Sequence, residues 1–211
     1  MMKNCERGRS MIEMLGVLAI VGILTAGGIA GYSKAMQKIK RDKVVTQLSM
    51  LVMNIRSLFF NQTNYSILSD RLLIDAGMAP SDMYDSAVKS SQVGLKHALG
   101  GNVYVFSSLN SEGQPRAFEV YLEGLTEDVC LALATADWGM DQASGFEALY
   151  VGTGDVNGAL MEDVNVPAVS RPENGIYTPG QHANAVPLTI NGARAACACS
   201  GATCVIGFKY R

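Results

Sequence analysis

One long apolar run dominates the beginning of the chain. Between Met11 and Tyr32 the only charged residue is Glu13. At about 1.5 Å per residue, a helix of this length spans the roughly 30 Å hydrocarbon core of a bilayer. A cleaved secretory signal is the alternative, but its apolar region is shorter, about 7–15 residues, and ends before a polar mature segment. The pattern therefore predicts a membrane-spanning helix over residues 11–32.

The apolar run passes into an amphipathic segment without a break. Apolar residues recur there at steps of three and four, the spacing of one helical face; they are Val44, Val45, Leu48, Leu51, Val52, Ile55, Leu58 and Phe59. We therefore expect one long helix over residues 9–61. Its first half is apolar on all sides, and the stripe on its second half predicts packing against a folded domain.

The rest of the chain, residues 62–211, has the shorter patterns of an α+β head domain. Strands are expected where apolar and polar residues alternate between turn signals; these are residues 102–108, 117–124, 146–152, 185–191 and 204–210. One short helix is expected after a cap at Ser66 or Ser69, and another between Thr126 and Gly139. The predicted fold is α+β, with the long helix packed on an antiparallel sheet.

Composition and motifs narrow the function classes. The 211 residues carry a formal net charge of -2, so no nucleic-acid partner is expected. We find no phosphate-binding loop, His-Glu-x-x-His or Gly-x-Ser-x-Gly motif, and therefore expect neither an enzyme nor a cofactor. His97 and His182 are expected to be surface or loop residues. Residues 152–163 contain acids and amides, but the glycine lies too early for an EF-hand, which favours a solvated loop over a calcium site.

Glu13 needs an explanation, because an ionised acid within an apolar span costs on the order of 2.5–3.5 kcal/mol. A snorkelling acid at the membrane interface is one explanation. The neighbouring residues favour another, since Gly8 lies five positions before Glu13 and follows a short polar head that contains Lys3 and Arg7. This arrangement, followed by a long apolar helix, resembles the N-terminal signature of type IV prepilins and pseudopilins.

The resemblance implies a route of processing and assembly. A prepilin peptidase would cut after Gly8, remove residues 1–8 as a leader and methylate the new amine of Arg9, a cation where the family usually has an apolar or aromatic residue. Glu13 would be the assembly glutamate, its carboxylate paired with the amine of another subunit in a helical homopolymer. Before assembly the chain would lie in the bacterial inner membrane with a periplasmic head. The assembly platform and minor pilins would then build an extracellular pilus.

The head resembles the type IVb branch of the family, which includes pilins of conjugation systems. The similar stretches are "LIDAGMAPSDM", "LGGNVYV" and "GLTEDVCLALA". The resemblance implies a structural subunit of a filament for adhesion, conjugation or motility. Two alternatives stay open: a minor pilin or type II secretion pseudopilin, and a single-span binding or sensor protein that does not polymerise.

Small residues along the apolar run predict close helix packing. Gly27 and Gly31 form a small-xxx-small pair, and Gly16 and Gly22 lie nearby. Small residues let membrane helices approach closely. Ordinary membrane-helix composition is the alternative to a filament core of packed helices.

Five cysteines are present, and cleavage of the leader would remove Cys5. The remaining even set, Cys130, Cys197, Cys199 and Cys204, indicates two disulfides in an exported domain and allows three connectivities. Cys199 and Cys204 flank the turn-like "SGAT", which favours their pairing and leaves Cys130 to Cys197, so that disulfides bound the region 130–204. A zinc site is the rival, but no second Cys-x-x-Cys pair accompanies Cys-x-Cys, and no metal is expected.

The charges that flank the span conflict with the expected orientation. More basic residues follow the apolar run than precede it, and a plain positive-inside count would place the head in the cytoplasm. The cysteines and the resemblance both place the head outside, and together they outweigh the charge count.

Overall fold

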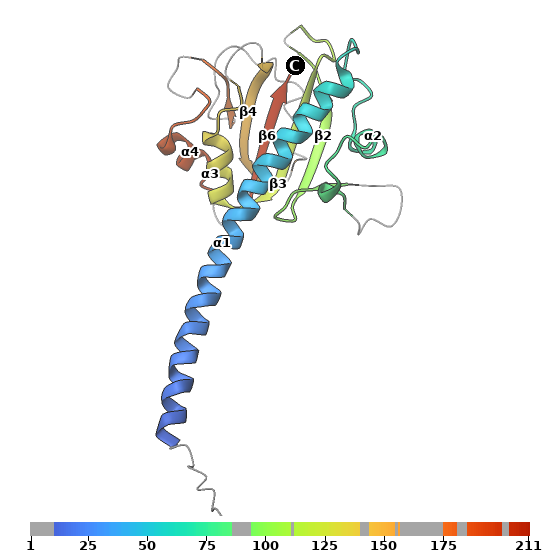
Figure 1. Cartoon of the computed structure of the whole chain (residues 1–211). Helices are drawn as coiled ribbons and strands as arrows, with labels where there is room; N and C mark the ends of the chain where they lie inside the picture. The colour runs from blue at the N-terminus through green and yellow to red at the C-terminus, as the bar shows by residue number, and fades with distance from the viewer. Residues whose placement is uncertain are drawn as a thin grey trace, which may run out of the picture. The chain divides into compact units, whose positions relative to one another are not determined.

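The computed structural model describes residues 11–85, 94–110, 112–139, 144–154, 156, 175–180, 185–199 and 203–211. Two compact units make up the chain, Met1–Lys40 and Arg41–Arg211. The longest element, helix α1 (Met11–Phe59), contributes to both (Figure 1). The other helices are α2 (Asp70–Asp75), the 3-10 turn η1 (Ser81–Met83), α3 (Glu127–Thr135) and α4 (Ile190–Ala196).

The described part of the first unit is helical throughout. Every residue from Met11 to Tyr32 is exposed, including large apolar side chains such as Ile12, Leu18 and Ile23. This part of α1 has the length and apolar composition of a membrane-spanning helix. Because the described residues leave these side chains exposed, lipid or other copies of the helix can bury its apolar surface.

The second unit is built around one antiparallel sheet. Its strands are β1 (Leu95–Lys96), β2 (Asn102–Ser108), β3 (Ala117–Leu125), β4 (Phe146–Thr153), β5 (Ile176–Tyr177) and β6 (Cys204–Tyr210), in the order β1-β2-β3-β6-β4-β5. The last strand in sequence lies at the centre, where Phe208 pairs with Val120 of β3 and Leu149 of β4. All seven residues of β6 are buried. The expected antiparallel sheet is confirmed.

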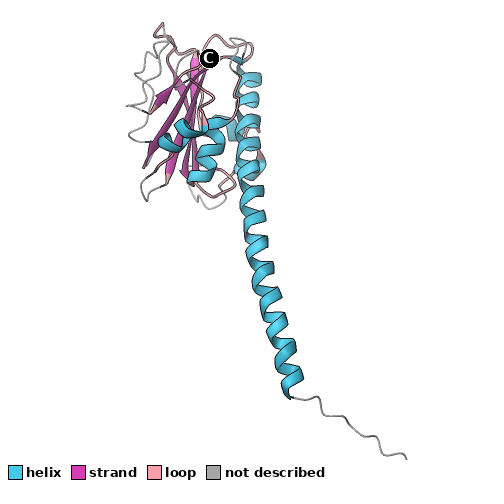
Figure 2. Ribbon diagram, turned by 90° about the vertical axis from the view of Figure 1, so that its left-hand side faces the viewer, coloured by secondary structure: helices cyan, strands magenta, loops and turns pink. Residues whose placement is uncertain are grey.

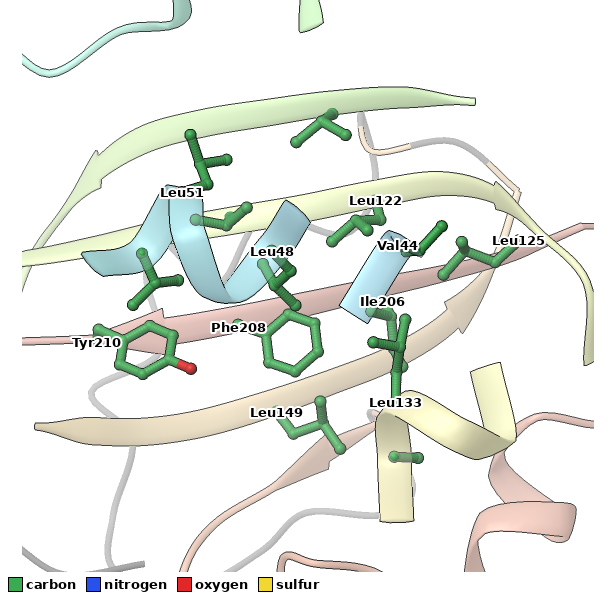
Figure 3. Packing of buried hydrophobic residues seen from close by; sticks show 14 of the residues in the cluster. Val44, Leu48, Leu51, Leu122, Leu125, Leu133, Leu149, Ile206, Phe208 and Tyr210 are labelled. Atoms are coloured by element: carbon green, nitrogen blue, oxygen red, sulfur yellow. The ribbon is translucent and has the colours of Figure 1, made fainter. Parts of the chain in front are cut away.

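The core lies between the second half of α1 and one face of the sheet. Val44, Leu48 and Leu51 of α1 are essentially fully buried. They face apolar side chains from β3, β6, β4 and α3 (Figure 3); among these are Leu122, Leu125, Ile206, Phe208, Leu149 and Leu133. Figure 2 shows α1 and α3 on the same side of the sheet. Burying each such side chain contributes about 1.5–3 kcal/mol, so the predicted apolar stripe is the main attachment of this helix to the sheet.

The opposite face of the sheet carries a second, smaller core. Tyr121, Ala148, Ile176 and Val205 are buried there. Adjacent residues of a strand point to opposite faces, so Val120 contributes to the core under α1 and Tyr121 to this one. Coverage of both faces explains why β3 and β6 lack the clean alternation of a half-exposed strand.

One predicted strand is wrong. Residues 185–191 form only an isolated bridge between Val186 and Pro179, and helix α4 begins at Ile190. Pro187 has no N–H to donate to a ladder. The Thr189 side chain caps α4 by accepting from Gly192 N at 3.2 Å, an arrangement that favours a helix start over a strand.

Helix boundaries agree with the sequence patterns to within a few residues. Ser69, rather than Ser66, caps α2, and Leu72 N donates to its Oγ at 3.2 Å. Helix α3 ends at Thr135, earlier than the expected end near Gly139. Strands β1 and β5 were not predicted, because two residues are too few to show alternation.

Candidate functional site

The assembly residues expected from the sequence lie at the start of the chain. Glu13 is in the first turn of α1 and is exposed. Gly8, Arg9 and the leader, residues 1–8 with Cys5, lie outside the described residues. A carboxylate in the first turn of a helix is favoured by the partial positive charge of the free N–H groups there. This stabilisation by the helix N-terminus is small, about 0.3–1 kcal/mol, so Glu13 still requires a counter-charge in an apolar surrounding.

The four glycines predicted to pack helices have open space beside them. A Cβ added at Gly16, Gly22, Gly27 or Gly31 would meet nothing within 4 Å in the described part of the chain. Contacts inside the subunit therefore do not require glycine at these positions. They leave shallow places on α1 where another helix can approach.

Two disulfides tie the end of the chain to the head domain. Cys130 of α3 is bonded to Cys197, directly after α4, with their Cα atoms 5.9 Å apart. Cys199 is bonded to Cys204, the first residue of β6, with a Cα separation of 5.5 Å. This is the pairing expected from the sequence. All four residues are buried, so the bridges act as structural links rather than reactive thiols.

The two disulfides lie side by side. The sulfur atoms of Cys130, Cys199 and Cys204 are within 4.8 Å of one another. Such a group resembles part of a zinc site, but a metal ligand must be a thiolate. Sulfur atoms already joined in disulfides offer no thiolate.

A buried ion pair lies on the face of the sheet opposite α1. Glu119 of β3 and Lys209 of β6 are register partners, and Lys209 Nζ is 3.6 Å from Glu119 Oε1. Ser108 Oγ donates to Oε1 at 2.6 Å and Tyr121 OH donates to Oε2 at 2.8 Å. This cluster is not among the sites expected from the sequence. Its signal in the sequence is a single charged residue flanked by apolar residues within each of two strands, Glu119 between Phe118 and Val120 and Lys209 between Phe208 and Tyr210.

His97 lies in the loop after β1, one of the two settings expected for it, but its side chain is buried rather than exposed. It is 3% exposed, its Nε2 lies 2.7 Å from Glu123 O, and its Nδ1 accepts from Leu99 N at 3.2 Å. These partners identify Nε2 as the donor. Burial lowers the pKa of His97, which favours the neutral ring. His97 therefore links the turn before β2 to β3.

Gln47 is a second buried polar residue that the sequence analysis missed. It lies among the apolar positions of α1, donates to Asp82 Oδ2 at 3.1 Å and accepts from Ala98 N at 2.9 Å. Lys43 completes this link with its Nζ 2.7 Å from the same oxygen of Asp82. The amide thus joins α1 to the 3-10 turn η1 and to the turn before β2.

Other candidates fall partly or wholly outside the described residues. His182 is among them, as is most of the loop 152–163. Trp138, three residues after the end of α3, packs its ring against Phe208 with the centroids 4.7 Å apart.

The combination of an apolar N-terminal helix, an antiparallel sheet on the second half of that helix, and disulfides near the C-terminal strand defines a class of structural subunit, the type IV pilins. The sequence profile of the Bundlin family matches residues 34–207. The chain belongs to this family and is a structural pilin of the type IVb branch.

Two curated relatives show the same class. The chain is 29% identical over 141 residues to the major structural subunit of bundle-forming pilus of Escherichia coli O127:H6 (strain E2348/69 / EPEC). This alignment covers 66% of this chain and 69% of the relative. It is 23% identical over 134 residues to the toxin coregulated pilin of Vibrio cholerae. That alignment covers 64% of this chain and 59% of that pilin.

Two solved structures share the fold. A type IVb pilin from Salmonella typhi aligns with a TM-score of 0.52 and 17% identity, over 80% of this chain and 97% of the pilin. A type IV pilin from Vibrio cholerae El Tor biotype aligns with a TM-score of 0.56 and 16% identity, over 82% of this chain and 99% of that pilin. These likenesses confirm the predicted architecture.

Proposed function

We propose that this chain is the main filament-forming subunit of a type IVb pilus, cut after Gly8 and polymerised through the helix that begins at Arg9. The observation that carries the proposal is the apolar surface of α1 from Met11 to Tyr32, which the described residues leave exposed, with Glu13 at its start. A bundle of identical helices would bury that surface. The α-amine of Arg9 on a neighbouring subunit would supply the counter-charge for Glu13.

The glycines support the same proposal. Close approach of helices needs small residues at the contact, and no contact within the described part of the chain requires glycine at Gly16, Gly22, Gly27 or Gly31. The relatives also support a main subunit rather than a rare one, since the Escherichia coli protein is named a major structural subunit.

The proposal includes a location and partners. Before assembly, α1 holds the chain in the inner membrane and the head lies in the periplasm, where the two disulfides of the head can form and persist. A prepilin peptidase processes residues 1–8, and the assembly platform with minor pilins extends the filament. The filament then serves adhesion, conjugation or motility outside the cell.

Glu13→Ala tests the proposal, with Glu112→Ala as the matched control, because Glu112 is an exposed acid on the β2–β3 connection. We expect Glu13→Ala to lower the amount of the protein in sheared filament fractions by at least about tenfold. The substitution leaves the α-amine of Arg9 on the neighbouring subunit unpaired, and one unpaired charge costs several kcal/mol in an apolar setting. The membrane pool should persist, and Glu112→Ala should assemble normally. Normal filaments from Glu13→Ala would overturn the proposal.

Two measurements separate the alternatives. N-terminal sequencing of the filament protein should begin at Arg9, whereas Gly8→Val should leave Met1 in place and abolish filaments. A minor pilin or pseudopilin would be scarce in the filament fraction relative to another subunit. A single-span binding or sensor protein would be absent from that fraction altogether.

A further inference from the structure

A cleft lies at the end of the head where β3 begins and β6 ends. Register pairing places Phe118 of β3, Tyr210 of β6 and Phe146 of β4 side by side at this end. The cleft has a volume of about 570 Å³ and is lined by Arg56, Arg116 and Arg211 together with the loop that follows α1. No acidic side chain is among its described lining residues. A cleft lined by one sign of charge attracts ions of the opposite sign.

Arg56 is held in position before any ligand arrives. Its Nη2 donates to the main-chain oxygen atoms of Ser144 and Arg211, and its guanidinium carbon lies 5.2 Å from the centroid of the Tyr210 ring. Its Nε is buried and has no hydrogen-bond partner among the described residues. A fixed guanidinium loses little conformational freedom on binding, which favours affinity for an anion.

The two other arginines are exposed at the mouth of the cleft. Arg116 lies just before β3 and Arg211 follows β6. Within the described part of the chain, neither side chain takes part in an ion pair shorter than 4 Å. Neither guanidinium is therefore fixed in a salt bridge, although Arg211 also acts on Glu147 of β4 from beyond salt-bridge distance.

The remaining lining indicates which kind of anion fits. Phe60 is 85% exposed, and Gln62 and Thr63 offer exposed neutral hydrogen-bonding groups beside it. A sugar ring presents an apolar face and hydroxyl groups, and an acidic sugar adds a carboxylate or sulfate for guanidinium groups. The volume lies in the range of small-ligand sites, about 300–1,000 Å³. Proteins that bind nucleic acid instead present an extended basic surface along its phosphates. The net charge of -2 on the whole chain argues against such a surface.

We propose that this cleft, between Arg56, Arg116, Arg211 and Phe60, binds an acidic glycan through its carboxylate or sulfate groups. The guanidinium groups hold the anion, and the Phe60 ring lies against the sugar. The cleft uses the C-terminal end of α1 and none of the apolar run 11–32 on which the assembly proposal rests, so glycan binding can be tested independently of polymerisation.

Isothermal titration of the full-length protein in non-ionic detergent tests the proposal. The probes are a sulfated heparin disaccharide, a galacturonate disaccharide that carries carboxylates alone, and neutral maltose. We expect at least one acidic disaccharide to bind and maltose to bind at least tenfold more weakly. Arg116→Gln and Arg211→Gln should each weaken binding by about fivefold, the upper range for one exposed ion pair. The acidic probe that binds more tightly identifies the preferred anion.

Arg194→Gln is the matched control, because Arg194 is an exposed arginine on α4 outside the cleft and its loss changes the net charge equally. It should bind the acidic disaccharide as the original chain does. Equal weakening by Arg194→Gln, no effect of Arg116→Gln and Arg211→Gln, or no binding of either acidic probe would overturn the proposal. So would tighter binding of a short single-stranded oligonucleotide at the same cleft, which would assign the cleft to nucleic acid.

Discussion

Glu119 and Lys209 face each other across the two central strands, and the side chain of each is 1% exposed. Removing two charges from water costs several kcal/mol each, which their attraction offsets only with further hydrogen bonds. Ser108 and Tyr121 provide such bonds to the carboxylate. The pair therefore fixes the register of β3 against β6, while adding little net stability over an apolar pair of the same shape.

Lys209→Met should destabilise the head by about 3–5 kcal/mol, because it leaves the Glu119 carboxylate buried without its counter-charge. The double variant Glu119→Gln/Lys209→Met should recover most of that loss. Fluorescence of Trp138, which packs on Phe208 of the neighbouring core, can follow urea unfolding in detergent. A double variant as unstable as Lys209→Met alone would contradict this account.

The two disulfides should differ in their effect on stability. Cys130–Cys197 spans 67 residues of sequence and Cys199–Cys204 spans 5. In the chain-entropy treatment, a longer loop loses more freedom when it is closed, and the bridges contribute about 4 and about 2 kcal/mol respectively. Cys130→Ser/Cys197→Ser should therefore lower the free energy of unfolding more than Cys199→Ser/Cys204→Ser. If urea unfolding shows equal losses of unfolding free energy for the two double variants, loop length does not govern the effect.

Asp70 should make the head less stable as the pH rises through the weakly acidic range. Burial raises its pKa to about 6, partly opposed by the hydrogen bond from Val105 N at 2.8 Å. Below the ordinary carboxyl pKa both the folded and unfolded forms are protonated. Between about pH 4 and pH 6 the unfolded chain loses the proton first, so stability falls by up to about 3 kcal/mol and then levels off.

Asp70→Asn isolates this effect, because the amide oxygen can still accept from Val105 N. The variant should match the original chain near pH 3.5 and be more stable by about 2–3 kcal/mol at pH 7. Asp75→Asn is the control, since Asp75 is exposed and its salt bridge with Arg71 lies on the surface. A difference between the Asp70 variant and the original chain that does not change with pH would contradict the raised pKa.

The sequence predicts those parts of the fold that depend on the spacing of apolar residues along a helix or strand and on helix-capping residues. The three- and four-residue spacing of Val44, Leu48 and Leu51 marks the face of α1 that is buried, and one of the two serines expected as a cap, Ser69, starts α2. The region 185–191 was misjudged, because an apolar run around a proline reads as an edge strand while Thr189 starts a helix.

Buried polar partners depend on contacts between distant segments, and local patterns do not reveal them. Gln47 meets Asp82, and Glu119 meets Lys209 because β6 inserts between β3 and β4. The arginine cleft has the same origin. Its three arginines are far apart in sequence and gather only because the start of β3, the end of β6 and the end of α1 share one end of the head.

Gly27 and Gly31 provide the sharpest test of helix packing in the filament. Gly27→Leu/Gly31→Leu should leave the head fold unchanged, because a side chain at either position meets nothing within 4 Å in the described part of the chain. It should also strengthen the helix itself, since glycine costs about 1 kcal/mol relative to better helix formers. Filament yield should nevertheless fall several-fold, because bulky side chains hold neighbouring helices apart.

Ala26→Leu/Ala30→Leu adds bulk on an adjacent side of α1 and is the matched control. Its filament yield should change less than that of the glycine variant, and the membrane level of both variants, measured by immunoblot, should equal that of the original chain. If the glycine variant assembles fully, the glycines are ordinary membrane-helix residues. The packing in the filament core then depends on other side chains of α1.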